Sequence, residues 1–333
     1  MTVQERNIWY NAKRNERRME RNGGIMRYHL KKGILLGIAL ACSLGLTEPA
    51  KASSSQKSEN KKVEQYFSQS AFVGNSVSKG LQMYFDYQGK NFLGHPCMLV
   101  QESYSFANDR TGNTRFMISY QGQKYKAKDA IAKAKVKRVF ISMGINDLWH
   151  SASETSQEYI DYVEGIRRKN PGIIIFIQST TPMCDARKKA FLNNACINAL
   201  NKKMEQYCKK KKDTYYLDIR QGMTNSQGDL KYSSDGYVHM TMEGYRIWTN
   251  NLKSQVSKLL KEEQIAKDAV KKAEKKRTKA AYLKAKQVVK QLEKSTTREE
   301  LYKELKGKIK KNLKKENSKK EKAKKEKAKK EKK

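Results

Sequence analysis

The chain has 333 residues, of which 38% are hydrophobic and 32% are charged, and its formal net charge is +37. This length allows one ordinary domain with further segments attached to it. The charge distribution excludes a single uniform domain, because residues 1–62 carry +8, residues 63–260 carry +11 and residues 261–333 carry +18.

The first 52 residues have the features of an export signal preceded by an extension. The basic stretch Arg27–Lys32 is followed by the apolar run Gly33–Leu46 and by a small-x-small sequence that ends at Ala52. This order predicts a signal peptide with cleavage after Ala52, and the apolar run is shorter than the about 20 residues that span a bilayer. Because Met26 directly precedes the signal, we expect the protein to start there. The mature chain is then secreted or associated with the cell surface or cell wall.

Residues 53–66 are rich in Ser, Lys, Glu and Asn, have little to bury, and are predicted to be a linker. In residues 67–260, short apolar runs alternate with segments of helical spacing. This alternation predicts an α/β domain with a parallel sheet that is covered on both faces. Strands are predicted at Ala71–Gly74, Cys97–Val100, Val139–Met143, Ile173–Gln178 and Tyr215–Ile219, with a hairpin over Thr114–Tyr125. Helices are predicted at Val77–Phe85, Ala127–Lys135, Glu154–Lys169, Ala186–Lys211 and Met242–Leu260.

Residues 261–333 form a Lys-rich tail with two apolar stripes at helical spacing. One stripe runs from Ala266 to Ala273 and the other from Tyr282 to Leu292, which predicts two amphipathic helices resembling spacer modules of bacterial surface proteins. A third helix over Leu301–Ile309 would continue them. The segment Lys319–Lys333 repeats Lys, Glu and Ala and is predicted to be disordered or a solvated helix.

The stretch most informative about function is Ala71–Ser76, an apolar run that ends on Gly-Asn-Ser before a helical pattern. Such a pattern predicts a strand whose carboxyl end carries Ser76, where open α/β sheets bind their ligands. On its own, the same sequence is an ordinary turn in which Ser76 caps the next helix.

Two further stretches favour a catalytic interpretation. Gly144-Ile145-Asn146-Asp147 follows another predicted strand, and Asp235-Gly236-Tyr237-Val238-His239 precedes a helix. Over roughly Phe67 to Leu259 the chain resembles the SGNH (GDSL-like) hydrolases, whose blocks are Gly-Asp-Ser, Gly-x-Asn-Asp and Asp-x-x-His in that order. The resemblance implies a three-layer, flavodoxin-like α/β fold and an esterase or deacylase.

In this scheme Ser76 is the nucleophile and His239 is the base that a Ser hydroxyl needs. Asp235 would orient the imidazole, although it lies four residues before His239 and the family's acid lies three before its His. A backbone carbonyl in that role, leaving a Ser-His dyad, stays open. A structural role for His239 is the alternative to a catalytic one.

The oxyanion of the intermediate would be bound by the side-chain amide of Asn146 and the backbone N–H of Ser76. The family's third donor is a Gly N–H after the second strand, where this chain has no Gly, so a donor near Ser105 or Phe106 is unassigned. Asn75 replaces the family's Asp.

The sequence predicts neither a metal site nor a cofactor. The cysteines of the mature chain lack the close spacing of a metal site, and both disulfides and free thiols remain open. These cysteines are Cys97, Cys184, Cys196 and Cys208.

The sequence is therefore interpreted as an exported serine esterase or deacylase that acts on a small acyl ester, an O-acetylated polysaccharide or a cell-wall glycan. Its tail would contact wall polyanions, or only act as a spacer. The alternative is a surface carbohydrate-binding or anchoring protein with impaired catalysis, favoured by Asn75, the missing Gly and the Asp235–His239 spacing. Nucleic-acid binding rests on charge alone, and the export signal argues against it.

Overall fold

The structure, a computed structural model, describes residues 49–307, 318 and 321. The described residues divide into two units between Lys62 and Val63, and the described part of the first unit is the beginning of helix α2 (Pro49–Ser68). The predicted signal peptide up to residue 48, and nearly all of Lys319–Lys333, lie outside the described residues. Among the helices that the structure describes, none is long and apolar enough to cross a membrane.

The second unit is built on a five-stranded parallel sheet with the order β2-β1-β5-β6-β7. The strands are β1 (Ser70–Gly74), β2 (Cys97–Val100), β5 (Arg138–Ser142), β6 (Ile174–Gln178) and β7 (Thr214–Leu217). All residues of β1 are buried, as expected for a strand covered on both faces. The order reverses direction at β1, which creates a switch point between β1 and β5 at the carboxyl edge of the sheet.

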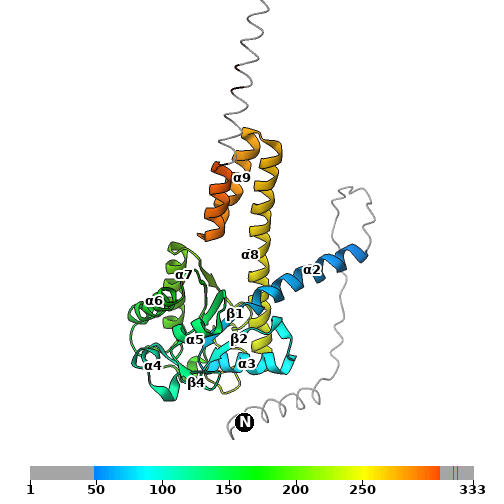
Figure 1. Ribbon diagram of the computed structural model, residues 1–333. Coiled ribbons are helices and arrows are strands. Elements are labelled where there is room, and N and C mark those ends of the chain that lie inside the picture. Colours follow the sequence, from blue (N-terminus) through cyan, green and yellow to red (C-terminus); the bar gives the residue numbers. More distant parts are fainter. Residues whose placement is uncertain (1–48, 308–317, 319–320, 322–333) are drawn as a thin grey trace, which may run out of the picture. The chain divides into compact units, whose positions relative to one another are not determined.

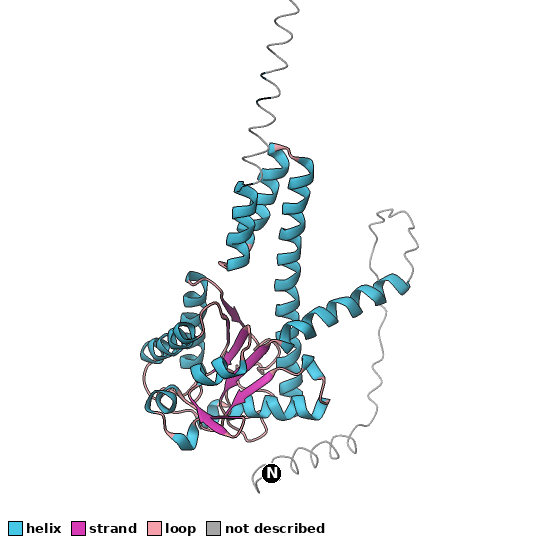
Figure 2. Ribbon diagram, in the orientation of Figure 1, coloured by secondary structure: helices cyan, strands magenta, loops and turns pink. Residues whose placement is uncertain are grey.

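Helices cover both faces of this sheet (Figures 1 and 2). Helix α6 packs against α5 and α7, while α3 packs against α8, so the helices form two separate layers. These helices are α3 (Ser76–Gln88), α5 (Ala127–Ala134), α6 (Ala152–Lys169), α7 (Asn194–Lys210) and α8 (Met242–Lys276). The predicted three-layer α/β architecture with a parallel sheet is therefore confirmed.

An aromatic ladder runs across four neighbouring strands inside the core. Phe72, Phe140, Phe176 and Tyr215 are partners in the strand register, and their ring centroids are 5.0, 4.5 and 5.0 Å apart. The rings lie nearly parallel, with interplanar angles of 7–17°. Such stacked pairs add to the stabilisation that burial alone provides and fix the strand register. The register in turn determines which residues follow the strand ends at the carboxyl edge of the sheet, where Ser76 lies.

Short elements complete the domain. Helix α4 (Phe106–Thr111) follows β2, and the hairpin β3 (Ile118–Tyr120) and β4 (Gln123–Tyr125) turns at Gln121 and Gly122, both with positive φ. Such a pair of positive φ angles suits the two-residue turn that the sequence predicted. Short 3₁₀ turns lie at Phe92–Gly94, Thr114–Phe116 and Asp185–Arg187.

The C-terminal helices form a second, smaller core. Helix α8 continues past residue 260 and ends before Arg277, where the chain turns. The next helix, α9 (Lys279–Gln291), packs against α8, and a further helix covers residues 296–307. The predicted apolar stripes are buried in this cluster, which includes Ala266, Val270, Ala285 and Val289. The predicted boundary at 260 therefore falls inside one continuous helix.

This helical hairpin is anchored to the amino edge of the sheet through Asp213, the residue before β7. The Asp213 carboxylate accepts hydrogen bonds of 2.7 Å from both the N–H and the hydroxyl of Thr296, and the Asp213 N–H donates to the Lys294 carbonyl. Asp213 therefore caps a helix that begins 83 residues later in the chain.

Two segments differ from the sequence-based expectation. Residues 53–66, predicted to be a linker, lie within α2, whose carboxyl end is held by the buried side chains of Val63 and Phe67. Helix α7 begins at Asn194 and not at Ala186, because Asn193 caps it by accepting the N–H of Cys196. The residues before Asn193 instead form a loop at the carboxyl edge of the sheet.

Candidate active site

Ser76 is the first residue of α3 and follows the carboxyl end of β1 directly. Its neighbour Asn75 is the N-cap, because its buried side chain accepts the N–H of Val77 at 3.1 Å. Asn75 therefore takes the capping role that the sequence alone also allowed for Ser76. The Ser76 N–H lies in the first turn of α3, where backbone donors have no partner within the helix.

Close packing at Gly74 fixes this turn. A Cβ atom on Gly74 would lie 2.0 Å from the Ser78 hydroxyl and 2.8 Å from the carbonyl oxygen of Ser142 on β5. A larger residue would push α3 away from the sheet and displace Ser76. Position 74 therefore requires Gly, because there is no room for a Cβ atom.

The structure brings Ser76, His239 and Asp235 together. His239 Nε2 lies 2.9 Å from Ser76 Oγ, and His239 Nδ1 lies 2.7 Å from Asp235 Oδ2. With the proton on Nδ1, the imidazole donates to the carboxylate and accepts the hydroxyl hydrogen of Ser76. This is the geometry by which an imidazole acts as a general base on a hydroxyl.

The loop before α8 accommodates the four-residue spacing between Asp235 and His239. The second carboxylate oxygen of Asp235 accepts the N–H of Tyr237 at 2.8 Å and the N–H of His239 at 3.2 Å. Gly236 has φ +66°, which lets the chain turn tightly beside the carboxylate. Asp235 thus holds both the loop and the imidazole ring.

The same contacts act on the ionisation of Asp235. Partial burial opposes its charge, but hydrogen bonds from the His239 side chain and the Tyr237 N–H outweigh this effect and hold the pKa of Asp235 below its usual value. The carboxylate therefore remains charged in mildly acidic solution and continues to orient His239.

Asn146 lies in the loop after β5 and reaches across the end of β1. Its side-chain NH₂ donates one hydrogen to the carbonyl of Tyr104, in the loop after β2, at 3.1 Å. Because β1 lies between β2 and β5, this hydrogen bond joins the loops on either side of the strand that leads to Ser76. This contact uses one of the two hydrogens of the Asn146 amide.

Asp147 fixes the position of Asn146. Its buried carboxylate accepts the N–H of Phe106 at 2.7 Å and the N–H of Gly144 at 3.1 Å, and so connects the same two loops. Burial raises the pKa of Asp147 to about 7, against the lowering effect of these two hydrogen bonds. The Phe106 N–H is therefore already occupied, and Ser105 serves as the N-cap of α4.

Ser103 is the residue in this region that sequence reasoning missed. It has φ +55°, a left-handed conformation that Gly adopts most easily, and lies in the loop after β2 that leads to α4. The backbone thus makes a left-handed turn without the expected Gly. A Ser in this conformation has no sequence signature, so only the structure reveals it.

Among the described residues, no cysteine belongs to the hydrogen-bonded series of Ser76, His239 and Asp235. The four cysteines that the structure describes are all free thiols, and burial raises the pKa of Cys97 to about 11 and that of Cys208 to about 12. Within the described residues, no group of three or more His, Cys, Asp or Glu side chains is arranged to hold a metal ion.

The part of the chain that contains this site matches a known protein family. Residues 72–247 match the model of the GDSL-like Lipase/Acylhydrolase family. The chain belongs to this family. Ser76, Asn146, Asp235 and His239 all lie within the matched region, and the chain is accordingly an ester-hydrolysing enzyme. No curated protein matches the chain.

Several solved structures are similar to this GDSL-like hydrolase. A GDSL-like lipase from Bacteroides thetaiotaomicron VPI-5482 is 18% identical, with 62% of this chain and 97% of that chain covered and a TM-score of 0.44. A carbohydrate esterase family 3 protein from Talaromyces cellulolyticus is 12% identical, with coverage of 58% and 98% and a TM-score of 0.39. A member of the lipolytic G-D-S-L family from Veillonella parvula DSM 2008 is 13% identical, with coverage of 55% and 94% and a TM-score of 0.37.

Two departures of this GDSL-like hydrolase from its family's pattern have a structural counterpart. Asn75 replaces an Asp but caps α3, and Asp235 reaches His239 across one additional residue. In the loop without the family's Gly, Ser103 makes a left-handed turn and the Phe106 N–H is bonded to Asp147. The hydrogen-bonded series of Ser76, His239 and Asp235 is complete despite these departures.

Proposed function

We propose that this protein is an exported serine esterase that removes O-acetyl groups from a polysaccharide or cell-wall glycan. The observation that carries the proposal is the hydrogen-bonded series Ser76, His239 and Asp235, with distances of 2.9 and 2.7 Å. The predicted signal peptide supports a location outside the cell, where such polymers occur.

In the proposed mechanism, Ser76 Oγ attacks the ester carbonyl carbon while His239 Nε2 takes the hydroxyl proton. The C=O π bond breaks, and its electron pair becomes the oxyanion, which accepts hydrogen bonds from the Ser76 N–H and the Asn146 NH₂. Asp235 holds the ring and stabilises the imidazolium that forms. His239 then protonates the alcohol oxygen as its bond to the acyl carbon breaks.

The second half of the reaction repeats these roles with water. His239 removes a proton from a water molecule that attacks the acyl-Ser76 ester, the oxyanion forms again in the same place, and Ser76 leaves as it regains its proton. The products are the free alcohol and the carboxylic acid. Apart from this water molecule, each step uses side chains and backbone groups of this chain.

The openness of the site supports a polymeric substrate. The side chains of His239 and Asp235 are 39% and 33% exposed, so a sugar residue within a long chain has access to them. The alternative of a surface carbohydrate-binding or anchoring protein with impaired catalysis is not favoured, because Ser76, His239 and Asp235 form an unbroken hydrogen-bonded series.

The proposal is tested by acetate release from a panel of acetylated glycans, with 4-nitrophenyl acetate as a small reference ester. We expect the wild type to release acetate from at least one glycan and Ser76→Ala to release none from any substrate. Hydrolysis of the small ester without acetate release from any glycan would overturn the glycan assignment. Undiminished hydrolysis by Ser76→Ala would overturn the mechanism.

A further inference from the structure

A hollow of about 520 Å³ lies in the loop between β6 and α7. This loop follows the carboxyl end of β6, so it lies at the same edge of the sheet as Ser76. The volume falls within the range of about 300–1,000 Å³ that is typical of small-molecule sites. The hollow is lined by Asp185, Lys188, Lys189, Ala190, Asn193 and Ala195.

The loop is bonded directly to the segment that carries His239. The Cys184 N–H donates to the Tyr237 carbonyl at 2.8 Å, and Arg187 Nη1 lies 3.4 Å from the carbonyl oxygen of Asp235. The Arg187 guanidinium also lies over the Tyr237 ring, 4.9 Å from its centroid. The loop that lines the hollow is therefore in direct contact with the catalytic loop.

Hydrogen bonds within the loop form the hollow before any ligand binds. The Asn193 NH₂ donates to the carbonyls of Lys189 and Ala190 at 3.2 and 3.1 Å, and the Lys189 N–H donates to the Leu192 carbonyl at 2.9 Å. Because these bonds are made without a ligand, binding does not have to order the loop.

The charges that the loop presents to solvent are positive. Arg187, Lys188 and Lys189 are consecutive and exposed. The nearby acids are half-buried: Asp185 accepts the Asn194 N–H at 3.1 Å, and Asp229 accepts the Asp185 N–H at 3.1 Å. These carboxylates are directed at backbone donors, whereas the ammonium groups are left to meet a ligand.

We propose that this hollow is a subsite for a sugar residue that carries a carboxylate or a phosphate. The inference rests on the proposed function, since the sugar would belong to the polymer whose ester is placed at Ser76. Lys188 and Lys189 would pair with the anionic group. They lie outside the catalytic series, so they affect substrate binding and leave the chemical step unchanged.

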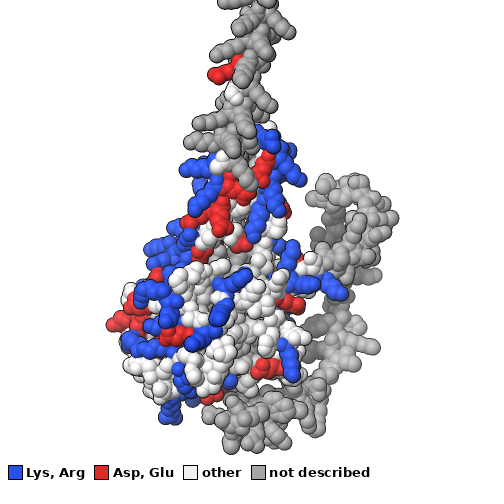
Figure 3. Space-filling view, viewed as in Figure 1, with Lys and Arg blue, Asp and Glu red and all other residues white. Residues whose placement is uncertain are grey.

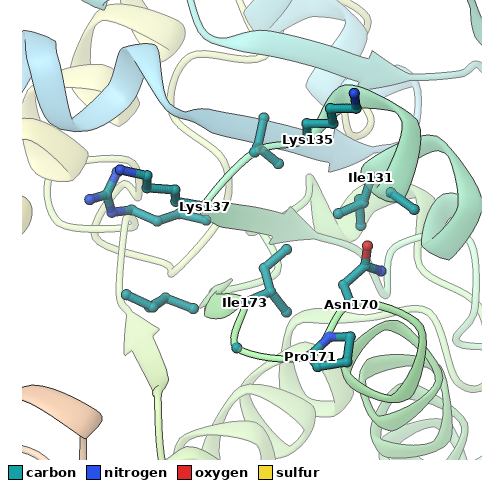
Figure 4. Close-up of a pocket in the computed structure, with 11 residues that line it drawn as sticks. Ile131, Lys135, Lys137, Asn170, Pro171 and Ile173 are labelled. Carbon is teal, nitrogen blue, oxygen red and sulfur yellow. The ribbon is translucent and has the colours of Figure 1, made fainter.

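The chain offers a matched control at the opposite edge of the sheet. A second hollow, of about 410 Å³, lies at the amino ends of β5 and β6 and is also lined by two lysines, Lys135 and Lys137 (Figure 4). Lys135→Gln/Lys137→Gln removes the same charge as Lys188→Gln/Lys189→Gln. The two double variants remove the same positive charge, one from the carboxyl edge of the sheet and the other from the amino edge.

The experiment compares acetylated polygalacturonate with the same polymer after amidation of its carboxylates, and measures KM and kcat for acetate release. On the charged polymer we expect KM to rise about five- to tenfold in Lys188→Gln/Lys189→Gln, the size of effect that two exposed ion pairs give. We expect kcat to be unchanged, the control variant to match the wild type, and the amidated polymer to show no difference between variants.

Equal KM values for wild type and both variants on the charged polymer would overturn the subsite, as would an equal rise of KM on the amidated polymer. Competition by poly(glycerol phosphate) that is lost in Lys188→Gln/Lys189→Gln would identify phosphate as the better ligand, and competition by galacturonate alone would identify carboxylate. Failure of the proposed function is seen separately, as a lack of Ser76-dependent turnover of 4-nitrophenyl acetate by the wild type.

Discussion

Asp235→Asn tests whether the carboxylate orients His239. In the wild type, Asp235 Oδ2 accepts the Nδ1 hydrogen of His239 at 2.7 Å, which leaves Nε2 free to accept the hydroxyl of Ser76. An Asn side chain would turn its NH₂ toward Nδ1, because its oxygen is held by the N–H groups of Tyr237 and His239. The imidazole proton would then move to Nε2, and the base would be lost.

The expected loss in kcat is about 10⁴-fold, the size of effect that a wrong imidazole tautomer has in a Ser-His-Asp triad. At about 1.36 kcal/mol for each factor of ten, this equals about 5 kcal/mol of transition-state stabilisation. The free energy of unfolding should change by about 1 kcal/mol or less, since the pair is partly exposed and the loop-holding acceptor remains.

The assay is steady-state hydrolysis of 4-nitrophenyl acetate between pH 5 and 9, with thermal unfolding measured in parallel. Asp229→Asn is the matched control, because it removes a charge from the same loop without touching His239. A rate for Asp235→Asn within tenfold of the wild type, with His239→Ala inactive, would refute the triad and support a Ser-His dyad.

Three further predictions concern stability and location. Asn75→Ala removes the cap on Val77 and should lower the free energy of unfolding by about 1 kcal/mol, whereas Asn75→Asp should not, as measured by urea unfolding. The unfolded chain binds a proton at Asp147 only below about pH 4, but the folded chain binds it up to about pH 7. Stability should therefore fall as pH rises through this window, and Asp147→Asn should lack this component. A chain ending at Gly307 loses 15 Lys and 4 Glu and should bind purified cell walls less tightly at low salt, with unchanged turnover of a soluble ester; equal, salt-insensitive retention would reject residues 308–333 as an anchor.

The face of the described residues that Figure 3 shows also carries many Lys and Arg side chains, with fewer Asp and Glu among them. The salt dependence of wall retention therefore needs the shortened chain as its reference. Only the difference between the two chains reports on residues 308–333.

The strands and the Ser76 turn were predictable because their signals are local. Apolar runs of four to six residues that end on Gly or polar residues determined the strands, and the blocks around Ser76 and Asn146 followed them. The positions of Ser103 and Asp147 were not predictable. A left-handed Ser has no sequence pattern, and the Phe106–Asp147 bond joins residues 41 apart.

The expectations that failed also have physical causes. The segment 53–66 has only Val63 and Tyr66 as hydrophobic residues, so its pattern did not predict the helix whose end is buried at Val63 and Phe67. The apolar pattern continues on both sides of Asn193, so it predicted a helix from Ala186. The Asn193 side chain caps α7 and sets its start at Asn194. The Asp213–Thr296 contact spans 83 residues and could not be read from either segment.

The most direct test of the central claim is covalent labelling by a serine-directed fluorophosphonate, read by intact mass and peptide mapping. We predict a single adduct on Ser76 in the wild type, formed at the rate at which esterase activity is lost, and no adduct in Ser76→Ala. Slow labelling in His239→Ala would agree with its role as base. An adduct on another residue, or full activity after complete labelling of Ser76, would contradict Ser76 as the nucleophile.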